Sequence, residues 1–515
     1  MHKSWHKQLR EVLGAFGVRD IRRTVGETGR LIDLRVREEK MRSIVEDKQL
    51  RSAARKVNQE KIAEDGDAAR QASWKFSELS KLVRAVPPPN ATLLGERAES
   101  LKSMLQARGD RRWNADMLTA TWRMASGTVP SHKVPQTGCD IGPGSFDVMK
   151  FAPVALNRAR TSLETAVAEI ADRIFAGDRT LLQELDAISI SAGVINKHRR
   201  AGSPPSVNHF PIDAADMSLG SIGWKLTLAR YLAGTVLKRY TGTGEGGYPL
   251  ENYDRLPRFF PNLSRDELHW LASQMERWVA TQTATGYFGV SEDTIRRANK
   301  LVLKFAQGAK PGLGGHILGA KVTTQVEDLR GVIAGISVFS PFPFHDVYSI
   351  EDVTKMIDWL RTINPDVIIS VKISTPIDVY HVALGLVTAG ADEIQIDATA
   401  GGTGAAPDIA RNRIAMPLEY GLSDVHKFLV EQGERNKVTL VASGGIRSAY
   451  DMAKAIILGA DKVILGTQEI VAQQCNRCGN CEAPGGCQKG ITTTVEQLEE
   501  QKEILLNAQW LINSQ

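Results

Sequence analysis

Four of the five cysteines stand within thirteen residues near the end of the chain, in the pattern C-x2-C-x2-C-x5-C: Cys475, Cys478, Cys481 and Cys487. Thiolates at such short spacing can wrap one small inorganic cluster, and a fourth nearby thiolate can complete a four-iron, four-sulfur cube. A four-cysteine zinc site is the alternative, because it also uses C-x2-C, but there the ligands usually come as two separated pairs. The spacing therefore favours an iron–sulfur cluster over zinc.

Two glycine-containing loops follow consecutive apolar runs in the last third of the chain. One contains Ser443, Gly444 and Gly445, and the other contains Gly466 and Thr467. Glycines let backbone N–H groups approach an anion closely, and two such loops after the last strands of a barrel form a recurrent phosphate site. For either loop taken alone, the alternative is a tight turn that binds no ligand. The pair at this spacing predicts phosphate binding.

Lys372 ends an apolar run, I-I-S-V-K-I, where a lysine costs desolvation free energy unless it faces an anion or an electron-rich ring. Beside a reduced flavin it would stabilise the negative charge that develops on the pyrimidine part of the ring. A strand-end lysine that reaches solvent is the alternative. A glycine run after Asp397 would let the backbone lie close to a flat ligand and supplies a hydroxyl group; it consists of Gly401, Gly402, Thr403 and Gly404.

Two further glycine-rich segments carry polar side chains that could meet a substrate. Residues 241–247 (T-G-T-G-E-G-G) place Glu245 among glycines, and residues 305–315 (F-A-Q-G-A-K-P-G-L-G-G) contain Gln307 and Lys310. Such loops often present polar groups to a substrate, although a solvated surface loop can have the same composition.

These residues need elements that bring the ends of several strands together. Between residues 206 and 470, short apolar runs alternate with amphipathic helical patterns, which is typical of successive βα units. We expect strands at 333–339, 367–373, 393–397, 438–442 and 462–465, and helices at 350–362, 376–388, 424–432 and 449–458. The pattern predicts an α/β fold, a (β/α)8 TIM barrel, because the strand–G-x-G-x-x-G–helix unit of the competing open sheet is missing.

The rest of the chain forms two predicted regions. Residues 1–205 predict a mainly helical region, with helices at 5–16, 32–59, 68–86, 91–107, 153–174 and 180–185. Within it, residues 137–146 (T-G-C-D-I-G-P-G-S-F) are interpreted as an ordinary loop, because no strand precedes them as in a phosphate cradle. Residues 471–515 predict the iron–sulfur segment followed by one helix at 494–515.

Composition excludes several classes of protein. The net charge is only +5, and no aromatic-interleaved basic groove or zinc-finger spacing indicates nucleic-acid binding. No run of about 18 apolar residues could span a membrane, and the polar first residues do not form a signal peptide. The clustered cysteines indicate metal ligation in a reducing compartment rather than a disulfide framework, so we expect a cytoplasmic protein.

Ordered motifs over residues 212–494 resemble the FMN-binding synthase domain of the glutamate synthase family. They are D-M-S-L-G-S-I (216–222), T-G-E-G-G (243–247), A-T-G-Y-F-G-V (284–290), A-Q-G-A-K-P-G-x-G-G (306–315), S-P-F-P-F-H-D-V-Y-S-I-E-D (340–352), V-K (371–372), G-G-T-G-A-A-P (401–407) and the cysteine pattern. The resemblance implies a barrel that holds FMN through Met217, Ser218, Gly220, Ser221, Lys372, Gly401, Gly402, Thr403, Gly404, Ser443, Gly444, Gly445, Gly466 and Thr467. It also implies that Glu245 and Lys310, with Gln307 as a third candidate, lie near the substrate. The family's usual three-iron cluster uses three cysteines, and the additional Cys478 favours a 4Fe-4S cluster here.

The resemblance also implies an oxidoreductase that condenses 2-oxoglutarate with ammonia and reduces the resulting 2-iminoglutarate to L-glutamate, with electrons delivered through the cluster to FMN. Two positions at which the family carries a Lys and an Arg are Thr281 and Tyr287 here, and desolvated carboxylates need cationic partners. The substrate is therefore left open between 2-oxoglutarate and another oxo acid or amine, as in a paralogue that makes N-methylglutamate from methylamine. A non-catalytic electron-transfer or assembly subunit is the alternative from another class.

The partners follow from what the sequence does not carry. The chain opens with Met1-His2-Lys3 rather than with the cysteine that starts a glutamine-hydrolysing domain, and it has no dinucleotide fingerprint. We therefore expect ammonia from solution or from a separate glutamine amidotransferase subunit. We expect electrons from ferredoxin or a separate reductase subunit, within an oligomer.

Overall fold

The computed structural model describes residues 211–249, 256–340, 344–401, 414–478 and 487–514, together with Ala406 and Cys481. Before residue 211 it describes the stretches 9–10, 12–13, 21–26, 31–33, 113, 115–127, 146, 149–151, 173, 180, 192–193 and 207–208. Three predicted cofactor residues, Gly402, Thr403 and Gly404, lie outside the described residues. So do most of the helices predicted before residue 205 and the loop predicted at 137–145.

Eight parallel strands close into a barrel. Their order around the barrel follows the chain, and the last strand pairs with the first: β5 (Ile212–Ala214), β6 (Thr241–Gly242), β7 (Val279–Ala284), β8 (Lys300–Lys304), β11 (Ile368–Ile373), β12 (Glu393–Asp397), β13 (Thr439–Ser443) and β14 (Lys462–Leu465). Val463 of β14 stands opposite Ile212 of β5, which closes the ring. The predicted (β/α)8 barrel is confirmed, and β12 and β14 have the predicted bounds.

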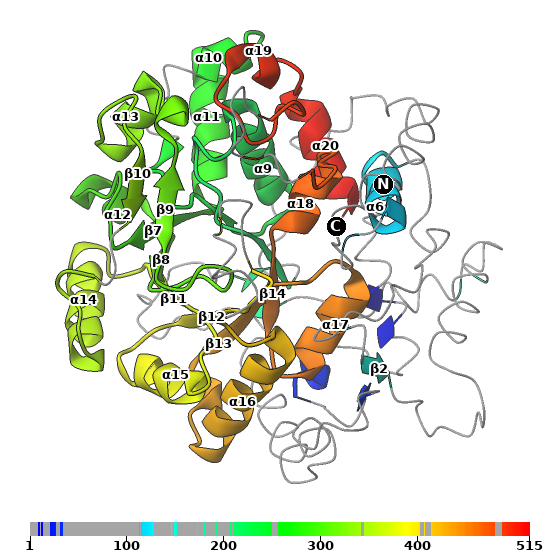
Figure 1. Ribbon diagram of the computed structural model, residues 1–515, viewed down its shortest axis with the longest axis vertical. Coiled ribbons are helices and arrows are strands. Elements are labelled where there is room, and N and C mark those ends of the chain that lie inside the picture. The colour runs from blue at the N-terminus through cyan, green and yellow to red at the C-terminus, as the bar shows by residue number, and fades with distance from the viewer. Residues whose placement is uncertain are drawn as a thin grey trace.

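Helices between successive strands surround the barrel (Figure 1): α9 (Trp224–Leu237), α11 (Arg265–Glu276), α12 (Glu292–Arg297), α14 (Ile350–Ile363), α15 (Val379–Thr388), α16 (Leu418–Glu431) and α17 (Ala449–Ile457). In α14, the Ser349 hydroxyl accepts a hydrogen bond from the Asp352 N–H and so caps the first turn. Val353 and Leu360 share its buried face at helical spacing. A polar cap followed by an apolar stripe stabilises this helix locally, and its bounds are close to the predicted 350–362.

The stretch between β8 and β11 leaves the barrel as a hairpin. β9 (Gly314–Ile317) pairs antiparallel with β10 (Val338–Ser340), and the loop between them carries α13 (Thr324–Arg330). The strand predicted at 333–339 is therefore wrong, both in its bounds and in its place in the barrel. Gly331 and Gly335 adopt positive φ there, at 65° and 79°, which turns the backbone and delays the strand to Val338.

The helix predicted at 494–515 is divided in the structure into α19 (Glu496–Glu499) and α20 (Ile504–Ser514). Lys502, between the two, is buried and donates a hydrogen bond to the Gln473 carbonyl oxygen at 2.8 Å. This tertiary contact interrupts a stretch that favours helix by local pattern alone. α20 then packs against α9 on the outside of the barrel.

The described part of the N-terminal region also packs on the barrel. α6 (Ala115–Ala125) lies against α20 and α18 (Thr467–Ala472) (Figure 1). The Lys454 ammonium of α17 donates to the Phe146 carbonyl oxygen at 2.7 Å, which anchors a second point. Residues Leu31–Asp33 form a strand, β1, that pairs with β2 (Met149–Phe151), so the helix predicted from residue 32 does not begin there.

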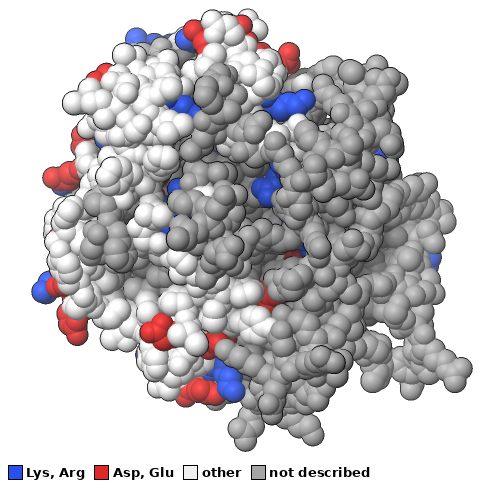
Figure 2. Space-filling model, viewed as in Figure 1, with Lys and Arg blue, Asp and Glu red and all other residues white. Residues whose placement is uncertain are grey.

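Two surface findings bear on the partner classes. Among the described helices, none combines the length and the apolar character needed to cross a bilayer. On the face shown in Figure 2, acidic and basic side chains are interspersed over the described residues, and neither sign covers a continuous patch.

Four charged side chains form an alternating ring at the amino-terminal end of the barrel. Lys300 contacts Asp213 and Glu393 at 2.9 and 2.5 Å, and Lys462 contacts the same two carboxylates at 2.8 and 2.5 Å. All four side chains are at most 3% exposed, and the Tyr240 ring centroid lies 5.0 Å from the Lys300 ammonium. Although burial alone would raise them, the two lysines hold the pKa values of Asp213 and Glu393 below their ordinary range. Two positive and two negative charges cancel, so the ring carries no net charge.

Candidate functional site

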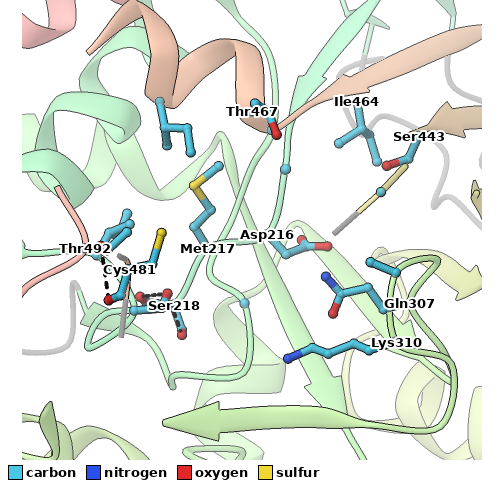
Figure 3. Close-up of a pocket in the computed structure, with 18 of the residues that line it drawn as sticks. Asp216, Met217, Ser218, Gln307, Lys310, Ser443, Ile464, Thr467, Cys481 and Thr492 are labelled. Carbon is cyan, nitrogen blue, oxygen red and sulfur yellow. Dashed lines mark hydrogen bonds between the residues drawn. The ribbon is translucent and has the colours of Figure 1, made fainter. Parts of the chain in front are cut away.

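One cavity of about 580 Å³ lies at the carboxyl ends of the barrel strands, a volume typical of cofactor and substrate pockets. It brings together every predicted site residue that the structure describes: Met217, Ser218, Gly220, Ser221, Glu245, Gln307, Lys310, Lys372, Gly401, Ser443, Gly444, Gly445, Gly466, Thr467, Cys475, Cys478, Cys481 and Cys487. Figure 3 shows Cys481, Thr492 and Ser218 at one end and Gln307 and Lys310 at the other, with Met217 and Asp216 between them.

The two glycine loops predicted to hold a phosphate lie on one wall of this cavity. Gly444 and Gly445 have φ values of 107° and 86°, which residues other than glycine rarely adopt. A Cβ atom added at Gly444 would stand 2.9 Å from the Gly401 backbone nitrogen, so the loop must be glycine to pack there. Gly466 is similarly close to Ala215 across the barrel seam, with 3.2 Å between its built Cβ and that side chain. These glycines therefore present backbone rather than side chains to the cavity.

Arg447 follows the first of these loops and was not among the predicted site residues. It lines the cavity and is buried, and its Nε donates to Asp451 at 3.2 Å. Its position directly after Gly445-Ile446 is the signal that could have identified it, since a cation beside a phosphate loop is a common arrangement.

Lys372 faces the cavity rather than solvent, so the alternative of a solvent-reaching lysine is wrong. Its Nζ donates to the Asp216 carboxylate at 3.0 Å, and both side chains are only 7% exposed. Burial would lower the pKa of Lys372, but Asp216, Asp397 and Glu245 together raise it to about 12. The ammonium is therefore charged at neutral pH. Asp216, the first residue of the D-M-S-L-G-S-I motif, is a site residue that sequence reasoning missed.

A second group of charges lies beside the first, because Lys304 of β8 stands opposite Lys372 of β11. Lys304 forms an ion pair with Glu245 and also donates to the Gln307 side-chain oxygen at 3.2 Å. Ser340, from β10, donates a hydrogen bond to the other oxygen of Glu245. Burial would raise the pKa of Glu245, but the Lys304 ammonium and these hydrogen bonds hold it below its ordinary value. Glu245 is therefore an anion held by a cation.

Arg330, at the end of α13, adds another cation, which interacts electrostatically with Glu245. It donates to the Ser218 hydroxyl at 2.8 Å and to the Gly315 carbonyl oxygen at 3.2 Å. Burial lowers its pKa to about 10, so it remains protonated at neutral pH. Sequence reasoning missed Lys304 and Arg330. Lys304 ends the buried strand K-L-V-L-K, and Lys372 is the penultimate residue of its own buried strand; that repetition was the available signal.

The two positions that lack the expected cations lie elsewhere. The Tyr287 hydroxyl donates to the Asp346 carboxylate at 2.8 Å, and its ring packs edge-on against Phe344. Thr281 is buried within β7. Neither is among the described residues that line the cavity, whereas Lys304, Lys310 and Arg330 are. The cations that line the cavity come from other positions.

The four predicted metal ligands form the third part of the cavity. None of the four thiols is in a disulfide. Burial raises the pKa of the Cys475 thiol to about 12. Burial would also raise the pKa of Cys487, but backbone N–H groups of Thr492, Ile491 and Lys489 that point at its sulfur hold it below the ordinary value. Amide donors around a thiolate are a feature of iron–sulfur sites.

The segment that carries these thiols is fastened to the β9–β10 hairpin. Lys321, which follows β9, donates to the Cys481 carbonyl oxygen at 2.5 Å, and the Thr492 hydroxyl donates to the same oxygen at 3.4 Å (Figure 3). Among the described residues, no three His, Cys, Asp or Glu side chains are arranged to hold a single metal ion. A multi-iron cluster places its thiolates around several metal atoms, and four thiols with amide and lysine donors fit that group by their chemistry.

The family model described as "Conserved region in glutamate synthase" matches residues 155–514, which is more than half of the chain. The chain belongs to the glutamate synthase family. The match covers the whole barrel, the cysteine segment and α20, so the resemblance read from the motifs is confirmed.

Curated members of the family match part of the chain. The archaeal-type glutamate synthase [NADPH] of Thermotoga neapolitana is 38% identical over 284 residues, which are 55% of this chain and 52% of that protein. The archaeal glutamate synthase [NADPH] of Methanocaldococcus jannaschii is 36% identical over 307 residues, 59% of this chain and 56% of that protein. The ferredoxin-dependent glutamate synthase of Cyanidium caldarium is 41% identical over 217 residues, 42% of this chain and 14% of that protein. The chain thus spans about half the length of the first two relatives and a much smaller part of the third.

Proposed function

We propose that this chain is the synthase part of a glutamate synthase, which binds FMN and an iron–sulfur cluster and reductively aminates 2-oxoglutarate to L-glutamate. One observation carries the proposal: a single cavity is lined by four thiols, two glycine loops, a charged lysine, and an acid among three cations. An electron entry point, a flavin site and a dicarboxylate site would thereby share one cavity.

The flavin site rests on the fit between the walls and the cofactor. The Gly444-Gly445 and Gly466-Thr467 loops would hold the phosphate, because their backbone faces the cavity. Lys372 would lie beside the ring, where its positive charge would suit an electron-rich partner. Asp216 is the ion-pair partner of Lys372 within the protein. Cys475, Cys478, Cys481 and Cys487 would hold the cluster, with 4Fe-4S favoured by the number of thiols. When bound, FMN would supply a hydride to the substrate, and the cluster would relay the electrons that replace it.

The chain's own residues would prepare the substrate. Arg330 and Lys304 would bind the carboxylates of the oxo acid, since charge-assisted hydrogen bonds are the strong ones in a desolvated site. Ionised Glu245 would hold the incoming ammonia as its ammonium form or accept the proton that it loses on attack. Lys310, buried on the same wall, would donate a proton to the departing oxygen. A C–N bond forms, the C–O bond breaks with loss of water, and two electrons and two protons then convert the imine to the amine.

The cation count supports a dicarboxylate over a less acidic substrate. Lys304, Lys310 and Arg330 line the cavity together with Glu245. Three positive charges and one negative charge give these four side chains a net charge of +2, which suits a desolvated dianion.

An anaerobic assay tests this proposal. The full chain, reconstituted with FMN, iron and sulfide, is given reduced ferredoxin or a chemical reductant together with a panel of oxo acids and either ammonia or methylamine, and products are identified by mass. We expect glutamate from 2-oxoglutarate and ammonia, together with a flavin spectrum that has a cluster shoulder. Lys372→Met should lower the rate by about 100-fold or more, as loss of one electrostatic stabiliser does. Lys427→Met, on the outer surface of α16, is the matched control and should leave the rate unchanged.

Each other outcome points elsewhere. N-methylglutamate as the main product would identify the amine-transferring paralogue. Intact cofactors without turnover of any oxo acid would identify an electron-transfer or assembly subunit, and a colourless protein after reconstitution would reject the cofactor site itself. The supply of ammonia by a separate amidotransferase subunit and of electrons by ferredoxin or a reductase subunit is part of the same proposal. Co-purification with tagged full chain tests it.

A further inference from the structure

Trp113 lines the cavity although it lies outside the family match, which begins at residue 155. Its indole is only 4% exposed and belongs to an apolar cluster with Leu118, Trp122 and Val471. Cys475, the first of the four thiols, packs against this cluster. A residue of the N-terminal region therefore forms part of the wall beside the cysteine end.

The position of Trp113 is fixed by the helix that follows it. α6 packs against α18 and α20, and the Asn513 amide of α20 donates to the Ala125 carbonyl oxygen at 2.9 Å. Asn513 is itself oriented by Gln509, whose amide donates to it at 2.6 Å. α18 carries Val471 in the same apolar cluster and begins at the Gly466-Thr467 loop. The helix is thus fastened to the elements that shape the cavity, and the indole is held against them.

We propose that Trp113 is a positioning residue that closes the cysteine end of the cavity and shields Cys475 from solvent. An apolar shell around a metal site controls solvent access and local dielectric, and a tryptophan is the largest side chain that can provide one. Its removal would open a space beside polar cavity walls, which water enters readily. That Cys475 binds a cluster rests on the proposed function. That Trp113 shields the Cys475 thiol from solvent does not depend on it.

The first experiment measures the thiol without any cluster. The full chain is purified under reducing conditions, exposed to a limiting alkylating reagent, and digested, and the modification of Cys475 is followed by mass spectrometry with Cys487 as the internal reference. Trp113→Ala should accelerate alkylation of Cys475 by about tenfold relative to Cys487. Tenfold is the lower end of the effects produced when a residue that supports a metal ligand is removed. Trp113→Phe, which keeps an aromatic ring, should give a smaller increase. Trp270→Ala, on the exposed face of α11, should behave as wild type.

The second experiment follows the reconstituted cluster. After anaerobic loading, the variants are mixed with air-saturated buffer and the decay of cluster absorbance is timed. Faster decay in Trp113→Ala than in Trp270→Ala is expected. Equal Cys475 alkylation in wild type and Trp113→Ala would overturn the inference, provided that circular dichroism shows a folded protein; if Trp113→Ala does not fold, Trp113→Phe and Trp113→Leu decide by the same comparison. If wild type binds no cluster, the proposed function fails while the alkylation result still decides the role of Trp113.

Discussion

Removing one lysine from the charged ring in the barrel should destabilise the protein far more than removing a surface lysine. In Lys462→Met the side chain keeps its apolar length, but Asp213 and Glu393 are left with Lys300 as their one remaining partner in the ring. Two negative charges against one positive charge leave a net charge of −1 among side chains that are at most 3% exposed. Breaking a buried ion pair in this way typically costs about 3–5 kcal/mol. The stability of a whole domain is only about 5–15 kcal/mol, so the loss should be easily measured.

The matched control is Lys427→Met. Lys427 pairs with Glu431 at 4.0 Å on the surface of α16, an exposed i,i+4 pair worth about 0.3–0.5 kcal/mol. Urea unfolding followed by circular dichroism compares the midpoints of the two variants with wild type at unchanged slope. A double variant, Asp213→Asn with Lys462→Met, restores neutrality and should cost less than the sum of the single changes. If Lys462→Met and Lys427→Met shift the midpoint equally, the ring does not stabilise the barrel as argued.

The same ring predicts a pH dependence with a definite sign. In wild type, the folded-state pKa values of Asp213 and Glu393 lie below the ordinary value near 4, so the stability they contribute is present above about pH 4 and is lost as pH falls further. In Lys462→Met one carboxylate has lost its cation, and burial should then raise its pKa. The stability deficit of the variant should therefore be largest at neutral pH and should shrink as pH falls, because protonation then removes the buried charge.

Three further predictions concern the cavity. Arg330→Met should raise the KM for 2-oxoglutarate by roughly 10- to 100-fold, because a charge-assisted hydrogen bond contributes about 1.5–3 kcal/mol, whereas Tyr287→Phe should leave it nearly unchanged; similar KM values in the two variants would show that the substrate binds elsewhere. Gly444→Ala should abolish flavin retention on desalting, since its Cβ would stand 2.9 Å from backbone, while Gly433→Ala, which has positive φ but open space, should retain flavin at a cost of about 1–2 kcal/mol in stability. Lys321→Met should lower bound iron by loosening the cysteine segment, and wild-type iron content in that variant would show that the tether is dispensable.

The strands whose bounds were predicted correctly are those with a clear local signal. β12 and β14 were predicted with their observed bounds because a short apolar run bounded by glycine or a charged residue is a property of neighbouring residues. The strand at 333–339 was wrong for a related reason: apolar residues in a hairpin loop have the same local composition as a buried strand. The glycines at 331 and 335 mark the turn, but their positive φ values are seen only in the folded chain.

The family of the chain, the barrel and part of the cavity lining followed from the sequence alone. In a parallel barrel all strands end at the same face, so any chemical residue placed just after a strand must converge on that face. The pairings inside the cavity did not follow. Lys304 meets Glu245, Arg330 meets Ser218 across 112 positions, and Trp113 reaches Cys475's apolar cluster from outside the barrel. Such contacts depend on how the β9–β10 hairpin folds back and how α6 docks. Long-range burial and charge pairing are set by tertiary packing, so they produce no periodic pattern in the sequence.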